Sequence, residues 1–265
     1  MTDKEYRKHP AISRSELFKM CDSPEKFKFY KDNEVEITPS LLFGQLFHKM
    51  VLEPETLFDE FVIEPKVDKR TKEGKALYAD FLENAKDKKA VPPDMFKKAE
   101  EMTLKLLKDK TAVNILKGKH EVPFFWKDKE TGEECKVRVD SLYEQGDTNI
   151  IVDLKTASKA DTGSFSRDAV KFGYDFQSGF YKEGVDICTG KKHLFVFLVI
   201  EKEPPYSINV LEADELFIKR GNLLFHDMLK LYHKCRESNN WYGYRGEDNK
   251  IQMLNLPNYL AKELE

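Results

Sequence analysis

The sequence lacks paired cysteines. Its 265 residues include four cysteines that lie far from one another along the chain: Cys21, Cys135, Cys188 and Cys235. Because no CxxC pair occurs, zinc and iron–sulfur sites built on such pairs are not expected. Isolated cysteines are typical of free thiols in a reducing compartment, so we expect a cytoplasmic protein.

Long apolar runs are also missing. Charged residues interrupt every apolar stretch before it reaches membrane-spanning length, and the opening segment MTDKEYRKHP lacks the apolar core of a signal peptide. We therefore expect neither a secretory leader nor a membrane partner. Hydrophobic residues make up 40% of the chain and aromatic residues 12%, which indicates a globular protein.

The chain has no excess of positive charge. Its net charge is −3, whereas a non-specific DNA binder usually carries a basic face, so the net charge alone argues mildly against DNA binding. A nuclease can still be acidic overall when its carboxylates collect around a metal and its lysines and arginines line one groove. The net charge therefore does not decide between these classes.

The first part of the chain is predicted to be mostly helical, up to about residue 118. Ser13 and Glu16 form a capping-box pattern, and Ser23-Pro24 opens a second short helix. Further helices are expected at residues 39–52, 72–86 and 93–109.

After residue 118 the pattern changes. Five β-rich runs are separated by turn residues or helices: EVPFFW, ECKVRVDSLYE, NIIVDLKT, HLFVFLVIE and YSINVLE. Long helices are expected at about 164–187 and 212–236, followed by an irregular end. We predict one α/β domain over residues 1–265, in which the helical part, 1–118, packs on a catalytic core, 119–265, with a central mixed sheet flanked by helices.

The run NIIVDLKT carries two charges on an otherwise apolar strand. Asp153 and Lys155 are two residues apart, so they share one face of the strand. A symmetric hairpin about the turn at residues 145–147 places Asp140 opposite Asp153, and a second hairpin about residues 129–132 places Glu121 opposite Asp140. Three carboxylates then align across three strands beside Lys155.

Clustered carboxylates repel one another unless a cation neutralises them. Hard oxygen ligands with open positions suit Mg²⁺ or Mn²⁺, which can polarise a phosphodiester and activate a water molecule. Lys155 can stabilise the developing charge. The alternative interpretation is a cluster of surface salt bridges, and spacing alone does not separate the two.

Five motifs together resemble a known family. Asp140 and Asp153-Leu154-Lys155, followed by Thr156, match the D–x(n)–(D/E)–x–K pattern of the PD-(D/E)XK nuclease superfamily. The other motifs span most of the chain in the family's order: ISRSELFKM, FGQLFHKMVLEP, FQSGFYKEG and LNLPNYLAKE. The chain resembles the RecE-type (exonuclease eight) phage exonucleases, which are related to lambda-type exonuclease. It departs from them at Tyr259, where a tryptophan is familiar.

The resemblance assigns His48 to the metal site. On a helix through residues 41–52, His48 lies opposite the apolar stripe, one turn after Gly44, so the pattern alone is equally typical of an exposed histidine. The family uses the histidine of this motif at the metal. The predicted metal-binding set is therefore His48, Asp140, Asp153, Glu121 and the carbonyl of Leu154.

Gln177 and Tyr181 are neighbours on the predicted helix 164–187, at its polar edge. The resemblance implies that this Q-x-x-x-Y pair flanks the active site, so both join Asp140, Asp153 and Lys155 in the predicted catalytic group.

A phosphate-binding group is expected near the N-terminus. Ser13 and Ser15 are most simply helix caps, although a helix start also favours an anion. A serine in this region of lambda-type relatives holds the 5′ phosphate. The predicted DNA-contacting residues are Ser13, Arg14, Ser15 and Arg138, with pairing to a carboxylate as the alternative for Arg138.

The resemblance implies an exonuclease that degrades linear double-stranded DNA 5′→3′ and leaves 3′ tails for strand annealing. It also implies a homo-oligomeric ring and a partner single-strand annealing protein. No GxxxxGK[ST] motif occurs, in agreement with ATP independence. The alternatives are a RecB-like or Cas4-like nuclease of the same superfamily, although Cas4-like proteins generally need a cysteine cluster, and a DNA-binding module that has lost catalysis.

Overall fold

The computed structural model describes residues 1, 3–33, 36–85, 88–146 and 148–257. Its centre is a six-stranded sheet in which β5 pairs with β1, β4 and β6, and β6 leads to β7 and β8. The strands are β1 (Ile12–Ser13), β4 (Lys119–Lys127), β5 (Glu134–Gln145), β6 (Thr148–Ala157), β7 (Leu194–Glu201) and β8 (Ile208–Glu212). The pairs β1–β5 and β6–β7 are parallel and the others are antiparallel, which confirms the predicted mixed sheet.

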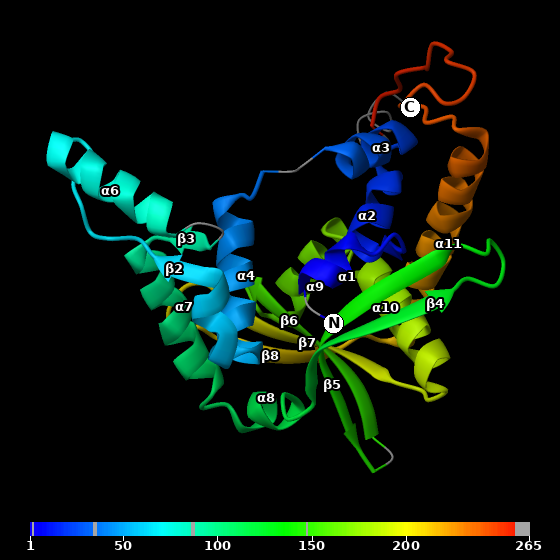
Figure 1. The fold of residues 1–265 in the computed structure, drawn as a ribbon. Helices are drawn as coiled ribbons and strands as arrows, with labels where there is room; N and C mark the ends of the chain where they lie inside the picture. Colours follow the sequence, from blue (N-terminus) through cyan, green and yellow to red (C-terminus); the bar gives the residue numbers. More distant parts are fainter. Residues whose placement is uncertain (2, 34–35, 86–87, 147, 258–265) are drawn as a thin grey trace.

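Helices cover both faces of the sheet (Figure 1). One face packs against α2 (Arg14–Leu17), η1 (Phe18–Cys21), α3 (Pro24–Asp32), α9 (Thr162–Lys171), α10 (Tyr174–Thr189) and α11 (Glu215–Ser238). The other face packs against α4 (Pro39–Leu52), α7 (Pro93–Leu106) and α8 (Lys110–Ile115). Strand β6 is therefore buried on both faces: Ile151 belongs to the first core, and Val152 and Leu154 belong to the second.

The N-terminal part contains more than the predicted helices. Strand β1 joins the main sheet, and β2 (Phe61–Ile63) pairs in parallel with β3 (Lys89–Val91). These strands are only two or three residues long, too short for an alternating pattern to reveal them. The remaining helices are α1 (Asp3–Lys8), η2 (Pro54–Thr56), α5 (Leu57–Glu60) and α6 (Lys72–Ala85), and α6 projects from the body as an arm (Figure 1). None of the described helices is both long and apolar enough to cross a membrane.

The helix predicted at 164–187 is two helices, so that prediction was wrong in its continuity. Gly173 separates α9 from α10 and has a φ of 66°, a left-handed conformation that favours glycine. The last predicted helix begins later than expected, because β8 continues to Glu212 and Asp214 caps α11.

Helices α10 and α11 approach each other backbone to backbone. A Cβ built on Gly179 would lie 2.5 Å from the side chain of Asn222, and one built on Gly221 would lie 1.9 Å from the carbonyl oxygen of Asp175. Each helix therefore uses a glycine where the other passes closest.

The chain after α11 forms no helix or strand between residues 240 and 257, as expected. Trp241 stacks on Phe27 with ring centroids 5.4 Å apart, so this tail packs on α3. The motif LNLPNYLAKE extends into residues 258–265, which include Tyr259 and lie outside the described residues.

The predicted capping box is confirmed at the start of α2. The backbone N–H and the hydroxyl of Ser13 both donate to Glu16 Oε2, at 2.9 and 2.6 Å, and Lys31 lies 2.5 Å from Oε1. Burial alone would raise the pKa of Glu16, but the hydrogen bonds from Lys31 and Ser13 outweigh it and lower the pKa. The ionised carboxylate therefore stabilises the fold.

This depressed pKa predicts an acid-sensitive contribution to stability. A group whose folded pKa is below its unfolded value stabilises the fold above the unfolded pKa, here about 4.3, and loses that contribution as pH falls. Glu16→Gln should lower the free energy of unfolding by about 1 kcal/mol at pH 7, and the difference should shrink as pH falls below about 4.3 and through the lower folded pKa. Urea unfolding of both proteins across this range measures it. A difference that stays constant with pH would show that the charge of Glu16 contributes nothing.

Gly173 and Gly190 form a matched pair for a second prediction. Both have left-handed backbones, with φ of 66° and 70°, but a Cβ on Gly173 would lie 2.2 Å from the ring of Phe18, whereas one on Gly190 meets nothing within 4 Å. Gly190→Ala should cost about 1 kcal/mol of stability from backbone strain alone. Gly173→Ala should cost roughly 1–3 kcal/mol more, because the ring of Phe18 must also move. Equal losses in thermal unfolding would contradict the role given to Phe18.

Candidate functional site

Asp140 and Asp153 occupy opposite positions on β5 and β6. The paired residues run in one register from Gln145–Thr148 to Ser141–Val152, and the next position along is Asp140 opposite Asp153, as the turn symmetry predicts. The carboxylate of Asp140 accepts a hydrogen bond of 2.7 Å from the backbone N–H of Leu154. Asp140 is thereby fixed beside the strand that carries Asp153.

His48 reaches the same place from α4. Its Nδ1 lies 3.5 Å from Asp140 Oδ2, and its side chain is 28% exposed. The apolar side of α4, which includes Phe43, Leu46 and Phe47, is buried against the sheet and fixes the orientation of the helix. The structure therefore brings His48 to Asp140, from a segment about 90 residues earlier in the sequence.

Asp153 is buried and held by two side chains. Its side chain is 3% exposed; Lys155 Nζ lies 2.5 Å from Oδ2, and the amide of Gln177 on α10 donates to Oδ1. Burial raises the pKa of Asp153, partly opposed by the positive charge of Lys155. Burial would lower the pKa of Lys155, but Asp153 and Asp140 outweigh it and raise the pKa. The lysine is therefore a firmly charged partner.

Two tyrosines line this pair. Tyr181, one turn after Gln177, has a pKa raised well above its usual value by burial and by the nearby Tyr6, Asp153 and Asp140. Lys155 Nζ lies 4.9 Å from the ring centre of Tyr174 at the start of α10. Sequence reasoning left Tyr174 and Tyr6 outside the site, because neither belongs to a motif with a recognisable spacing.

The third predicted carboxylate has an ion-pair partner of its own. Glu121 falls opposite Asp140 in the register, between the pairs His120–Ser141 and Val122–Val139. Its backbone, however, has a φ of 51°, and its carboxylate lies 2.6 Å from Arg138 Nε. The structure thus forms the alternative pairing considered for Arg138, while the metal role of Glu121 and the DNA role of Arg138 stay predictions.

The predicted phosphate-binding residues are engaged within the chain. The Ser13 hydroxyl donates to Glu16 and lies 3.3 Å from that of Ser15. Arg14 Nη2 donates to the carbonyl oxygens of Phe172 and Gly173, at 2.7 and 2.5 Å, and ties α2 to the α9–α10 junction. Their role toward a 5′ phosphate stays a prediction.

The donor types around Asp140 fit a hard divalent cation. Two carboxylates and the backbone carbonyl of Leu154 are oxygen ligands of the kind that Mg²⁺ and Mn²⁺ accept, and His48 adds a nitrogen. Burial of Asp153 among charges also favours a cation there. Within the described residues, however, the donor atoms of His48, Asp140 and Asp153 do not gather within 4.8 Å of one another. Binding an ion therefore requires these side chains to draw closer.

A different group of three side chains meets that distance within the described part of the chain: Asp128, Glu183 and His226. Sequence reasoning missed it, because its members lie 43 or more residues apart and belong to no spaced motif.

The buried pair of Asp153 and Lys155 generates a stability prediction. Removing one partner leaves an unpaired buried charge, which costs about 3 kcal/mol or more, whereas removing both leaves none. Lys155→Met should therefore lower the free energy of unfolding in EDTA by about 3 kcal/mol, and adding Asp153→Asn should restore most of it. Urea unfolding of the four proteins in the cycle measures the coupling. Additive losses would show that the pair is not coupled.

Comparison with known proteins identifies the fold. Residues 13–253 match the family model described as "PDDEXK-like domain of unknown function (DUF3799)". A crystal structure of a protein from Eubacterium rectale named "Putative exonuclease" is similar to the chain, with 17% identity, a TM-score of 0.66, and coverage of 97% of this chain and 96% of that one. A structure of SSO0001 covers 76% of this chain and 88% of its own at 13% identity and a TM-score of 0.31. No curated protein matches.

Proposed function

This chain belongs to the DUF3799 family of PDDEXK-like domains, and from that membership and the site geometry we propose that it is a metal-dependent nuclease acting on DNA. The observation that carries the proposal is the arrangement of Asp153. This buried carboxylate on the central strand lies beside Asp140 of the neighbouring strand β5, contacts Lys155 and is held by Gln177. The order of these side chains follows the D–x(n)–(D/E)–x–K pattern.

Each residue has a distinct role in this proposal. Asp140, Asp153, His48 and the Leu154 carbonyl would hold the ion, Mg²⁺ or Mn²⁺, which supplies a Lewis acid for the phosphate and an activated water. The ammonium group of Lys155 would move from Asp153 to stabilise the attacking oxygen or the negative charge that develops on the phosphate. Gln177 would keep Asp153 oriented, and Tyr181 would pack behind it.

The finer proposal is an exonuclease of the RecE type. It would degrade linear double-stranded DNA 5′→3′ without ATP and leave 3′ tails for recombination by strand annealing. Its support is the set of motifs that places His48, Asp140, Asp153 and Gln177 in the family's order. A homo-oligomeric ring and a partner annealing protein belong to the same proposal.

Asp153→Asn tests the chemistry with little change in shape. Wild-type protein with Mg²⁺ or Mn²⁺ should digest linear duplex DNA, and EDTA should abolish digestion. Asp153→Asn should lower the rate by at least 10³-fold, because loss of the carboxylate removes both a metal ligand and the partner of Lys155. Duplex binding should persist, since binding depends on many phosphate contacts.

Asp161→Asn is the matched control. Asp161 caps α9 through its Oδ1, and asparagine caps a helix equally well, so this variant should cleave like wild type. Equal rates for wild type and Asp153→Asn would place the active site elsewhere, and absence of cleavage in every protein would favour a DNA-binding module.

The direction of digestion is tested with labelled ends. Linear duplex should disappear while closed circular duplex resists, because a circle offers no end. A label at the 5′ end should be released early and one at the 3′ end should persist. Early release of the 3′ label would overturn the 5′→3′ proposal and leave the nuclease proposal standing. Digestion of closed circles would show an endonuclease instead.

Gly44 tests where substrate passes. It lies one turn before His48 on α4, and a Cβ built there meets no atom within 4 Å. Packing within the described chain therefore does not require glycine at this position. Gly44→Leu should leave thermal stability unchanged or raise it by up to about 1 kcal/mol, since glycine disfavours helix, and should lower kcat/KM about tenfold or more by obstructing DNA. An unchanged kcat/KM would show that DNA does not pass along α4 at Gly44.

A further inference from the structure

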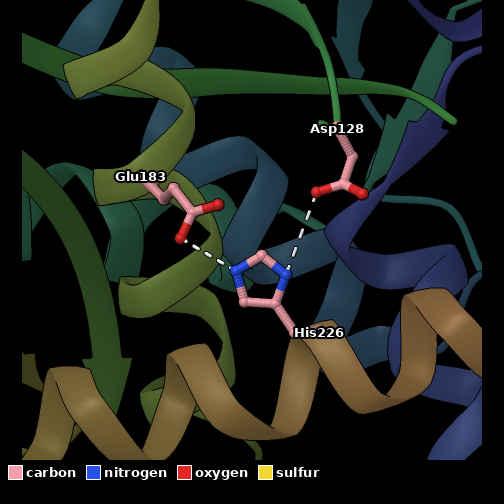
Figure 2. Close-up of side chains that lie close together, drawn as sticks. All are labelled: Asp128, Glu183 and His226. Atoms are coloured by element: carbon pink, nitrogen blue, oxygen red, sulfur yellow. Dashed lines mark hydrogen bonds and ion pairs between the residues drawn. The ribbon is translucent and has the colours of Figure 1, made fainter. Parts of the chain in front are cut away.

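Asp128, Glu183 and His226 lie close together (Figure 2), and none of them belongs to the proposed nuclease centre. Asp128 follows β4 in the turn to β5, Glu183 lies on α10, and His226 lies on α11. Glu183 is six residues beyond Gln177, about 9 Å further along α10. Three elements from distant parts of the sequence thus contribute one side chain each.

The three donor groups lie close enough together to share a single ion once the imidazole of His226 turns. His226 Nε2 lies 3.0 Å from Glu183 Oε2, His226 Nδ1 lies 3.9 Å from Asp128 Oδ2, and one donor atom from each residue falls within 4.8 Å of the others. A ring nitrogen binds an ion along its own lone pair, and Nε2 and Nδ1 face different carboxylates, so binding requires the imidazole of His226 to turn until one nitrogen faces both. Glu183 and His226 are 25% and 32% exposed and have room to rotate.

Hydrogen bonds hold one carboxylate oxygen of Asp128 in place and leave the other oxygen without a hydrogen-bond donor among the described residues. Its side chain is 7% exposed, and Oδ1 accepts hydrogen bonds from the N–H groups of Glu130 and Thr131 and from the Thr131 hydroxyl. Oδ2 accepts no hydrogen bond from the residues that the structure describes and faces His226 (Figure 2). Hydrogen bonds that orient one oxygen of a carboxylate and leave the other for an ion are typical of metal ligands.

The charge balance also favours a cation. Among the described residues, no lysine or arginine lies within ion-pair distance of Asp128 or Glu183, so His226 is their shared partner. The hydrogen bond that His226 donates to Glu183 raises the pKa of His226, which reflects the negative potential of the site. A divalent ion neutralises two carboxylates and a neutral imidazole fully, whereas one proton on His226 does so by half.

A neighbouring cluster on α11 provides the contrast. Two turns further along, His233 Nδ1 and Arg236 Nε lie 2.6 and 2.9 Å from Glu133 Oε1. This carboxylate already has two partners, one of them an arginine, so it has no need of an ion. His233 is therefore a control for His226 on the same helix.

We propose that Asp128, Glu183 and His226 bind a divalent transition-metal ion of the Zn²⁺ type, which fastens the β4–β5 turn to α10 and α11. One imidazole and two carboxylates suit Zn²⁺ and leave a fourth position for water. The ion has a structural role and takes no part in the proposed hydrolysis.

Metal titration tests the site without reference to activity. Co²⁺ added to metal-free protein reports its ligand geometry through visible absorption, and Zn²⁺ competes for the same site. Asp153→Asn should keep the Co²⁺ spectrum and the Zn²⁺ affinity, because the nuclease centre is separate. His226→Ala should lower Zn²⁺ affinity at least tenfold and abolish the Co²⁺ absorption, whereas His233→Ala should retain both.

Thermal unfolding with and without Zn²⁺ provides a second test. Zn²⁺ should raise the unfolding temperature of wild type and of His233→Ala, but not that of His226→Ala, since only a ligand bound to the native state stabilises it. Glu183→Gln repeats the test with a nearly isosteric change if His226→Ala does not fold. Equal Zn²⁺ affinity in wild type, His226→Ala and Glu183→Gln would overturn the proposal and leave His226 as an ion-pair residue. Loss of Zn²⁺ binding in Asp153→Asn alone would overturn it as well.

Discussion

The burial of a charged pair on the central strand governs the arrangement around it. Asp153 and Lys155 project from β6, whose two faces are otherwise covered by apolar side chains. Such a pair is costly to bury, so the surrounding elements must satisfy it. Gln177 on α10 donates a hydrogen bond to one oxygen of Asp153. Asp140 accepts a hydrogen bond from the backbone N–H of Leu154, the residue between Asp153 and Lys155. The packing of α10 and the register of β5 are thus tied to this pair.

The sequence predicted the strand pairing around this pair, because hairpin turns are encoded locally. The turns on either side of β5 contain glycine, and hairpin symmetry about them gives the observed registers of Ser141 with Val152 and of Val122 with Val139, next to the three predicted carboxylates. Periodicity also located α4 and the face of it that packs on the sheet. The mixed sheet followed from the order of β-rich and helical segments.

Other features depend on contacts that no local pattern encodes. The left-handed backbone of Glu121 turns its carboxylate toward Arg138, and nothing in EVPFFW signals it. The break at Gly173 was missed because the apolar stripe continues through it, from Phe165 to Phe176. Strand β1 has only two residues, and its pairing with β5 depends on tertiary structure alone.

The close approach of α10 and α11 has a consequence for sequence variation. Gly179 and Gly221 each lie where the other helix leaves no space for a methyl group, so the two helices are packed at a fixed distance from each other. A larger residue at either glycine requires one helix to shift away from the other, whereas exposed side chains elsewhere on the two helices meet no such constraint. Evolution within this fold should therefore change the exposed side chains of α10 and α11 far more easily than Gly179 and Gly221.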